Sequence, residues 1–341
     1  MNRVQADIES IVNKQELFAT LSGSKLLITG ATGLIGSMTM KTLHAADEKY
    51  GLDMKLVGQI RNEEKAKELY GSLYEKLGFV KTHDASYDYI IHTVSPTTSK
   101  FFIEHPVETI QASVSSTIDV MELAKKCNAS VVYLSSMEQY GVPSEHGQKM
   151  TEDKIGVIDH LNVRSSYSES KRLCECLCAS YAAEYGVDAK IVRLAQTVGA
   201  GVPPTDNRMP MQFARAVVEG KDIVLHTEGK SISNFVYLTD AITGILTVLE
   251  RGTKSEAYNI CNDKETRSVR EIADLVANEV ADGSINVKIE LKENMGYAPD
   301  VAMYLDSSKL RNLGWKAEVG MKEAYRRLAE YIRNTNIGVC Q

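Results

Sequence analysis

The chain has 341 residues, of which 43% are hydrophobic and 25% are charged, a balance typical of folded globular protein. Its net charge of −6 argues against a nucleic-acid partner, because such proteins carry clustered basic residues. No apolar run reaches the roughly 18 residues of a membrane span. The N-terminal stretch MNRVQADIESIVNKQELF has a polar helical pattern without the apolar core of a secretion signal. We therefore expect a cytoplasmic protein without a membrane partner.

Strands and helices alternate along the first part of the chain. The apolar run at residues 25–29 ends in a glycine and predicts the first strand, and a helical pattern follows it. Further strands are predicted at residues 54–60, 89–92, 130–134 and 189–194, and helices at residues 62–70, 106–126 and 166–185. Because this alternation is typical of parallel strands covered by helices on both faces, we expect an α/β fold with a Rossmann-type, doubly wound sheet.

The pattern becomes irregular after Gln196. Residues 199–209 are rich in Gly, Pro, Asp and Asn and predict a loop, and helices are predicted at residues 211–219 and 269–280. Such a mixture does not extend a parallel sheet, so we expect a smaller C-terminal α+β substrate domain. We assign residues 1–195 and 234–262 to a dinucleotide-binding domain, and residues 196–233 and 263–341 to the substrate domain.

Cys174, Cys176 and Cys178 form a cluster in the sequence. Residues two apart on a helix point in nearly opposite directions, so the three thiols cannot ligate one metal ion. We interpret them as small helix residues in a reducing compartment and predict no metal site.

The first predicted strand runs into the glycine motif Gly30-Ala-Thr-Gly33-Leu-Ile-Gly36, which opens a helix. Gly30 permits a tight turn, Gly33 lets the backbone approach a pyrophosphate, and Gly36 lets helix and strand pack closely. The helix N-terminus offers N–H groups and a positive dipole end to phosphates. We predict a dinucleotide cofactor here, bound by Gly30, Thr32, Gly33, Leu34, Ile35 and Gly36.

The residues after the second strand predict which form of the cofactor is bound. An acidic residue there favours NAD, whereas an arginine accommodates the 2′-phosphate of NADP. Arg61 and Asn62 stand at this position, so Arg61 favours NADP. The alternative is NAD with the arginine stacked on the adenine. Thr93, just after the strand at residues 89–92, is also a predicted cofactor-binding residue.

Tyr167 and Lys171 form a Y-x-x-x-K motif at the start of a predicted helix. Their spacing of four places both side chains on one helix face. A nearby ammonium group stabilises the phenolate, so we expect the pKa of Tyr167 to be lowered. Tyr167 is then predicted to remove a proton from an alcohol as a hydride leaves for the nicotinamide.

The order of the glycine loop, Ser135-Ser136 and the Tyr167/Lys171 motif resembles the short-chain dehydrogenase/reductase superfamily. By this resemblance Ser136 orients the substrate hydroxyl. Further stretches follow the order seen in nucleotide-sugar epimerases, dehydratases and decarboxylases, from about residue 25 to residue 333, namely DYIIH, PVETI, SSMEQYG, YLTD, YNI and LGW. The chain is identified as a member of the extended subgroup, which implies a nucleotide-sugar substrate.

Two stretches resemble UDP-glucuronate decarboxylases in particular. Ser135-Ser-Met-Glu-Gln-Tyr-Gly places Glu138 where simple 4-epimerases usually have a small residue. A carboxylate there can move the second proton that dehydration or decarboxylation requires. The stretch RSSYSESKR at residues 164–172 is similar to the corresponding decarboxylase stretch. This resemblance implies oxidation at C4 of the sugar, loss of CO2 and re-reduction of the ketone. The alternative for Glu138 is a solvated loop acid or a helix-cap partner.

The chain departs from the family pattern in its predicted substrate site. Met137 replaces a Ser or Asp, Gln196 replaces an asparagine, and Ser233 replaces an arginine that contacts diphosphate in several relatives. A serine has neither the charge nor the two-pronged donor geometry of arginine. Arg208 does match a family arginine. The predicted substrate-binding residues are Ser95, Met137, Gln196, Arg208 and Ser233, and Lys230 or Arg215 are alternative sources of positive charge.

Three other functions remain open from the sequence. Epimerisation of a nucleotide sugar retains Tyr167 and Lys171 but gives Glu138 no role. An NAD(P)H-consuming reductase of a sugar or polyol fits the missing arginine and Arg61. A catalytically silent binding protein is disfavoured, because Tyr167, Lys171 and Ser136 are all present. Resemblance to the family also implies a homodimer that pairs the helices at residues 106–126 and 166–185.

Overall fold

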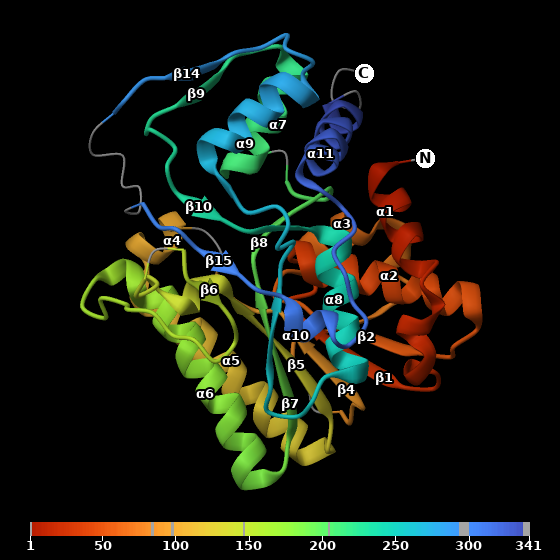
Figure 1. The fold of residues 1–341 in the computed structure, drawn as a ribbon. Helices are drawn as coiled ribbons and strands as arrows, with labels where there is room; N and C mark the ends of the chain where they lie inside the picture. Colours follow the sequence, from red (N-terminus) through yellow and green to blue (C-terminus); the bar gives the residue numbers. More distant parts are fainter. Residues whose placement is uncertain are drawn as a thin grey trace.

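A parallel sheet of seven strands forms the centre of the molecule (Figure 1). The computed structural model describes residues 2–82, 85–96, 99–145, 147–203, 205–292 and 300–336. The strand order is β3 (Gly78–Val80), β2 (Lys55–Gln59), β1 (Lys25–Thr29), β4 (Tyr89–His92), β5 (Ser130–Ser136), β7 (Asp188–Leu194) and β12 (Ala257–Ile260). The chain reverses direction across the sheet between β1 and β4, and the carboxyl ends of strands at such a switch point are where these sheets bind ligands. The predicted Rossmann-type fold is confirmed.

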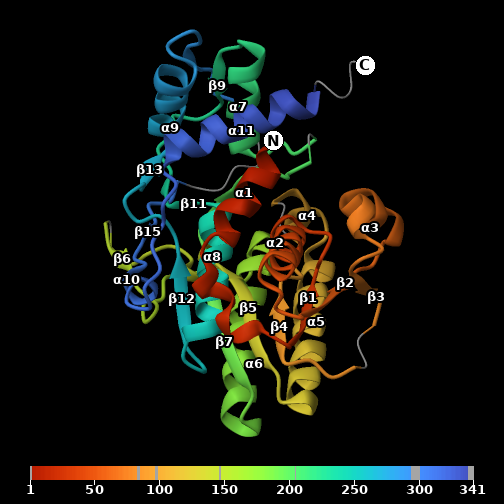
Figure 2. The same ribbon diagram turned by 90° about the vertical axis from the view of Figure 1, so that its right-hand side faces the viewer.

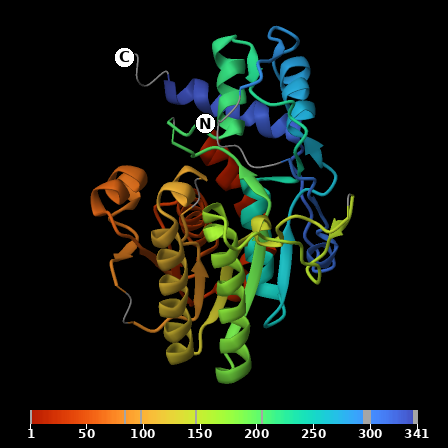
Figure 3. The same ribbon diagram turned by 90° about the vertical axis from the view of Figure 1, so that its left-hand side faces the viewer.

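Helices cover both faces of the sheet (Figures 2 and 3). One face packs against α2 (Leu34–Tyr50) and α8 (Leu238–Arg251), and the other against α5 (Pro106–Cys127) and α6 (Ser166–Tyr185). Among the described residues no helix is both long and apolar enough to cross a bilayer. The central strands are therefore buried on both sides, which explains their continuous apolar sequences.

Most element boundaries agree with the sequence-based expectation. The strands at residues 25–29 and 89–92 and the helix at residues 166–185 begin and end as predicted, and α3 (Glu63–Tyr70) starts one residue later than predicted. The helix α8 was not predicted, although its apolar residues recur with the spacing of an amphipathic helix. Residues 238–249 are all buried, and the helix packs against β5 and β7.

A second hydrophobic cluster lies beyond the carboxyl edge of the sheet. It includes residues of α7 (Met209–Glu219), α9 (Val269–Leu275), the π-helical η5 (Val276–Val280) and α11 (Met321–Asn336). Short strand pairs surround it or join it to the sheet: β8 (Gln196–Val198) with β11 (Phe235–Tyr237), β10 (Ile232–Ser233) with β13 (Arg267–Ser268), β9 (Ile223–Leu225) with β14 (Val287–Ile289), and β15 (Tyr304–Leu305) with β6 (Lys149–Met150).

The chain after β12 contributes to both hydrophobic clusters. Met303, Leu305, Leu310 and Trp315 pack in the core against the sheet, and α10 (Ser308–Arg311) contacts β12. Residues of α9 and α11 pack in the second cluster. The α+β composition of the smaller unit agrees with the expected fold class, whereas the exact division of the chain into two domains stays a prediction.

The N-terminal helix α1 (Arg3–Val12) connects the two parts of the molecule (Figure 2). It packs on α2 and α8 and also contacts α11. Asp7 on α1 is fully buried; its carboxylate accepts a hydrogen bond of 2.6 Å from the Tyr237 hydroxyl and lies 2.9 Å from Arg3 and 3.2 Å from Arg327. One buried carboxylate thus joins the N-terminal helix to the end of β11 and to α11.

Candidate active site

The glycine motif after β1 forms a tightly packed turn. Gly30 has a φ of +67°, a left-handed conformation that glycine adopts without steric cost. A Cβ atom on Gly36 would lie 2.5 Å from the carbonyl oxygen of Gly30, so only glycine allows this contact. Thr93 closes the turn from β4, since its hydroxyl donates 2.7 Å to the carbonyl of Thr29.

The N-terminus of α2 suits the binding of phosphate. Its cap residue is Gly33, and no side chain caps the free N–H groups of the first turn. A helix begun in this way presents unpaired donors and a positive dipole end to an anion. Thr32, Leu34 and Ile35 surround this end and are only partly buried. The residues present therefore fit the pyrophosphate of a dinucleotide.

A pocket of about 360 Å³ lies beside the carboxyl ends of β2 and β4 and brings together two predicted site residues, Arg61 and Ser95. Its volume falls in the usual range of small-molecule sites. Asn62 lies beside Arg61, but its side chain caps α3 by accepting a hydrogen bond of 2.9 Å from the N–H of Lys65. The pocket is lined by Arg61, Val94, Ser95, Pro96, Phe101, Glu108 and Ala112.

Tyr167 is the second residue of α6 and is 8% exposed. Its ring stacks on Phe102 with 4.3 Å between centroids and an interplanar angle of 5°. Burial raises the pKa of Tyr167 well above its usual range, the charge of Glu138 raises it further, and a hydrogen bond with Ser136 lowers it. The predicted lowering of the Tyr167 pKa by Lys171 is therefore wrong for this structure, because desolvation outweighs the other influences.

Lys171 lies one turn further along α6 on the same side as Tyr167, as its spacing predicts. Its ammonium is 5.7 Å from the centre of the Tyr167 ring and donates 2.6 Å to the carbonyl of Leu134 on β5. It also lies 4.9 Å from the ring of Tyr133. Burial lowers the pKa of Lys171 to about 8. The amine thus titrates near neutral pH and is directed at the strand end beside Tyr167.

Ser136 and Glu138 approach Tyr167 from the end of β5. The Ser136 side chain caps the short 3-10 turn at Met137–Tyr140 by accepting a hydrogen bond of 3.2 Å from the N–H of Glu138. Burial raises the pKa of Glu138, and the charge of Arg164 opposes this. Glu138 is partly buried in the structure. The Ser136 hydroxyl thus contacts Tyr167, and the Glu138 carboxyl lies close enough to act on the phenol through its charge.

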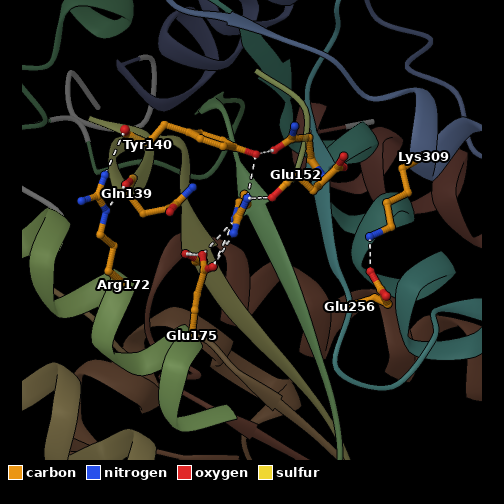
Figure 4. A network of polar contacts seen from close by, with 10 residues as sticks. Gln139, Tyr140, Glu152, Arg172, Glu175, Glu256 and Lys309 are labelled. Carbon is orange, nitrogen blue, oxygen red and sulfur yellow. Dashed lines mark hydrogen bonds and ion pairs between the residues drawn. The ribbon is translucent and has the colours of Figure 1, made fainter. Parts of the chain in front are cut away.

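A buried ion pair fixes the elements that carry these groups (Figure 4). Glu175, one turn beyond Lys171 on α6, binds Arg193 of β7 with nitrogen–oxygen distances of 2.7–3.2 Å and also accepts a hydrogen bond from Ser135. Arg193 also donates 2.9 Å to the hydroxyl of Tyr140. Arg172 of α6 donates to the carbonyl groups of Gln139, Tyr140 and Gly156. The helix α6 is thereby held to β5, β7 and the turn that carries Glu138.

The predicted substrate-side residues are more dispersed. Met137 is partly buried against the sheet-side core. Gln196 begins β8 and is exposed, and Arg208 precedes α7, where its guanidinium pairs with Asp206 at 2.7 Å. Ser233 lies on β10 with Arg267 of β13 directly opposite. These four residues thus come from separate elements: the turn after β5, β8, the start of α7 and β10.

Arg267 is a basic residue that sequence reasoning missed. Residues directly opposite in an antiparallel pair project from the same face, with Cβ atoms about 5 Å apart. Its guanidinium pairs with Glu265 at 3.0 Å and remains 36% exposed. Of the predicted alternatives, Lys230 pairs with Glu228, and Arg215 donates 2.6 Å to the carbonyl of Asp206. No local pattern marks Arg267, because its position depends on the pairing of distant strands.

The cysteine cluster lies on α6, beyond Lys171. Cys174 and Cys178 are buried between α5 and α6, and Cys176 is exposed on the opposite side of the helix. Over the ranges that the structure describes, no three His, Cys, Asp or Glu side chains are arranged to hold a metal ion.

The profile of the NAD dependent epimerase/dehydratase family matches residues 26–261. A UDP-glucuronic acid decarboxylase from Arabidopsis thaliana is 28% identical over 320 residues, which cover 92% of this chain and 90% of the relative. One from Danio rerio is 27% identical over 316 residues, covering 90% of this chain and 72% of the relative.

Solved structures show the same fold. An epimerase from Methanothermobacter thermautotrophicus superposes with a TM-score of 0.78 at 18% identity, covering 96% of this chain and 97% of that one. The UDP-glucuronic acid 4-epimerase of Bacillus cereus, in complex with UDP-glucuronic acid and NAD, has a TM-score of 0.75 at 20% identity, covering 91% and 99%. The glycine turn and the helix with Tyr167 and Lys171 both lie within residues 26–261, the part of the chain that matches the family profile. The chain belongs to the NAD dependent epimerase/dehydratase family.

Proposed function

We propose that this chain is a nucleotide-sugar decarboxylase that acts on UDP-glucuronate with a bound nicotinamide dinucleotide. The observation that carries the proposal is Glu138, a partly buried carboxyl with a raised pKa whose charge acts on Tyr167. Simple oxidation and reduction at one carbon requires Tyr167 alone as proton carrier, whereas decarboxylation requires a second proton donor. The sequence relatives named as UDP-glucuronic acid decarboxylases support the same chemistry.

The side chains divide the proton transfers between them. Ser136 orients the C4 hydroxyl, and Tyr167 removes its proton as the C4–H bond breaks. When bound, the nicotinamide dinucleotide accepts this hydride and later returns it. The 4-ketone makes the C6 carboxylate a β-keto acid, so the bond from C5 to C6 breaks, CO2 leaves and the electron pair forms an enolate with the C4 oxygen. Glu138 donates a proton to C5 and regains one from water, and Tyr167 returns its proton to the C4 oxygen as the ketone is reduced.

Burial shifts the pKa values of Glu138 and Lys171 in opposite directions, and both shifts suit the proposed roles. Because the pKa of Glu138 is raised, its acid form persists to higher pH than that of an ordinary carboxyl. Lys171, whose pKa is lowered to about 8, loses charge above that pH. We propose that the ammonium form of Lys171 positions Tyr167 and the cofactor ribose.

We also propose that residues 196–233 and 263–341 form the substrate domain.

Arg61 supports a proposal about the cofactor. It lines the pocket at the end of β2, where an arginine accommodates the 2′-phosphate of NADP. The family description names NAD, and the Bacillus cereus structure contains NAD. We propose that Arg61 enables this chain to bind NADP at least as tightly as NAD.

Arg267 supports a proposal about the substrate. The charge that Ser233 cannot provide is available one strand away, on the same face of the β10–β13 pair. We propose that Arg267 contacts the diphosphate of the nucleotide sugar. Its pairing with Glu265 is partly exposed, and such a pair contributes little stability, so exchange for a phosphate partner costs little.

The outer face of α5 and α6 supports a proposal about assembly. Val107, Ile110, Ile118 and Leu173 are between 38% and 59% exposed. The three on α5 recur at spacings that place them along one face of the helix. Since α5 and α6 pack side by side, we propose that this face pairs with a second copy of the chain.

The reaction is tested by incubating the enzyme with UDP-glucuronate and following the product by mass spectrometry. We expect loss of CO2 without net consumption of cofactor. Glu138→Gln is expected to lower kcat by roughly 10²–10⁴-fold while still forming reduced cofactor, whereas Tyr167→Phe forms none. Glu184→Gln, an exposed change on the same helix, serves as control. A product of unchanged mass would instead indicate an epimerase, and stoichiometric cofactor oxidation a reductase.

Cofactor preference is measured by calorimetric titration of the Arg61→Ala variant. A charge-assisted contact with phosphate contributes about 1.5–3 kcal/mol, so the Kd for NADP should rise on the order of 10–100-fold. The Kd for NAD should change much less. Lys67→Ala removes an exposed charge nearby that is already paired with Glu63 and should change neither. Equal losses for both cofactors would contradict a phosphate contact.

Moving the arginine from β13 to the opposite position on β10 tests whether Arg267 contacts the diphosphate. Arg267→Ser should weaken UDP binding on the order of 10–100-fold and leave uridine binding unchanged, because only UDP carries the diphosphate. Adding Ser233→Arg should restore UDP affinity by returning the charge from the opposite strand. Lys230→Ser is the matched control. If the single variant binds UDP like the wild type, Arg267 has no such contact.

Light scattering at micromolar concentration tests the dimer. The wild-type chain should have the mass of two copies, and Ile110→Glu should shift it to one copy, because a buried unpaired carboxylate opposes association. Val224→Glu on β9, similarly exposed, should leave the dimer intact. A monomeric wild type would refute the proposal.

A further inference from the structure

The short helix α4 (Ser99–Glu104) has consecutive aromatic residues with different surroundings. Phe101 is 36% exposed and lines the pocket that also contains Arg61 and Ser95. Phe102 is 2% exposed and stacks on Tyr167. Successive residues on a helix point about 100° apart, so α4 presents one ring to the pocket and the next to the tyrosine.

The stack with Phe102 is close and nearly parallel. The centroids are 4.3 Å apart and the planes differ by 5°. A second contact fixes the same region, because the hydroxyl of Ser166, which precedes Tyr167, donates 3.4 Å to the carbonyl of Phe102. One face of the Tyr167 ring is thus covered by carbon atoms and kept from water. This arrangement restricts the direction in which the phenol oxygen can point.

We propose that Phe102 is a positioning residue for Tyr167, and that α4 links the dinucleotide pocket to the reacting tyrosine. The proposal rests on the proposed role of Tyr167 as proton carrier. Proton transfer requires the phenol oxygen within hydrogen-bond reach of the substrate hydroxyl, and small displacements cost large factors in rate. Phe101 lines the pocket that we assign to the dinucleotide. A ligand in that pocket therefore contacts α4, the helix whose Phe102 stacks on the Tyr167 ring.

The covering ring also influences the ionisation of Tyr167. Around the phenol, Glu138 faces it from the turn after β5, Ser136 from the end of β5, and Lys171 from its own helix. Phe102 is the uncharged neighbour contributed by α4, and it acts by excluding water. Its removal admits water, and hydration lowers a pKa that burial has raised. Because Tyr167 accepts a proton in its ionised form, the rising limb of the rate profile should then move to lower pH.

Phe102→Leu, which removes the ring but retains an apolar side chain, tests the positioning role with UDP-glucuronate as substrate. We expect kcat to fall on the order of 10–100-fold, with a rising limb at lower pH and a cofactor Kd close to that of the wild type. Phe102→Tyr retains the ring and should recover most of the rate. Ile103→Ala, an exposed change on the same helix, should leave both the rate and the pH profile unchanged.

A measurement without turnover separates this inference from the proposed reaction. Nitration by tetranitromethane, located by peptide mass spectrometry, should spare Tyr167 in the wild-type holoenzyme and modify it in Phe102→Leu. Tyr185, which is 46% exposed, reports that the reagent is active in both. If Tyr167 stays protected in the variant, or if the variant retains wild-type kcat and pH profile, Phe102 does not position it. If the wild type lacks turnover but nitration follows the expected pattern, the proposed reaction fails and the contact remains.

Discussion

The buried ion pair between Glu175 and Arg193 is the interaction on which the site depends. It joins α6, which carries Tyr167 and Lys171, to β7, the strand between β5 and the edge strand β12. Arg193 extends the network to Tyr140, whose hydroxyl also donates 2.8 Å to Asn259 on β12. Removal of one partner from such a pair leaves a buried charge and typically costs about 3–5 kcal/mol. The helix, the turn with Glu138 and two strands are therefore fixed relative to one another by a single cluster.

Desolvation is the second constraint, because the groups around Tyr167 all lie in a medium of low polarity. Burial raises the pKa of Tyr167 and of Glu138 and lowers that of Lys171, so each group is biased toward its neutral form. Charges in such surroundings interact more strongly than in water. A bound anionic ligand therefore affects these three groups more than it would affect the same groups on the surface. The hydrogen bonds around Glu175 and Arg172 hold α6 to β5, β7 and the turn that carries Glu138.

The N-terminal helix α1 also carries a buried charged group, the carboxylate of Asp7. Asp7 is buried between Arg3, Arg327 and Tyr237, and burial raises its pKa although both arginines oppose this. The family profile starts after this helix and ends before α11, at residues 26 and 261. The contact thus joins segments outside the matched region to the end of β11. It fixes the position of the smaller hydrophobic cluster over the carboxyl edge of the sheet, where the candidate site lies.

The sequence by itself determined the features that depend on neighbours in the chain. Apolar runs predicted the strands, and the glycine spacing predicted the turn after β1, since both are local consequences of backbone geometry and burial. The spacing of Tyr167 and Lys171 placed them on one helix face. Only the tertiary structure decided which distant residues meet there. Phe102 reaches Tyr167, and Arg267 faces Ser233, across long sequence separations that no local pattern records. The direction in which the pKa of Tyr167 shifts also depends on the tertiary structure, because desolvation depends on every element that packs around the ring.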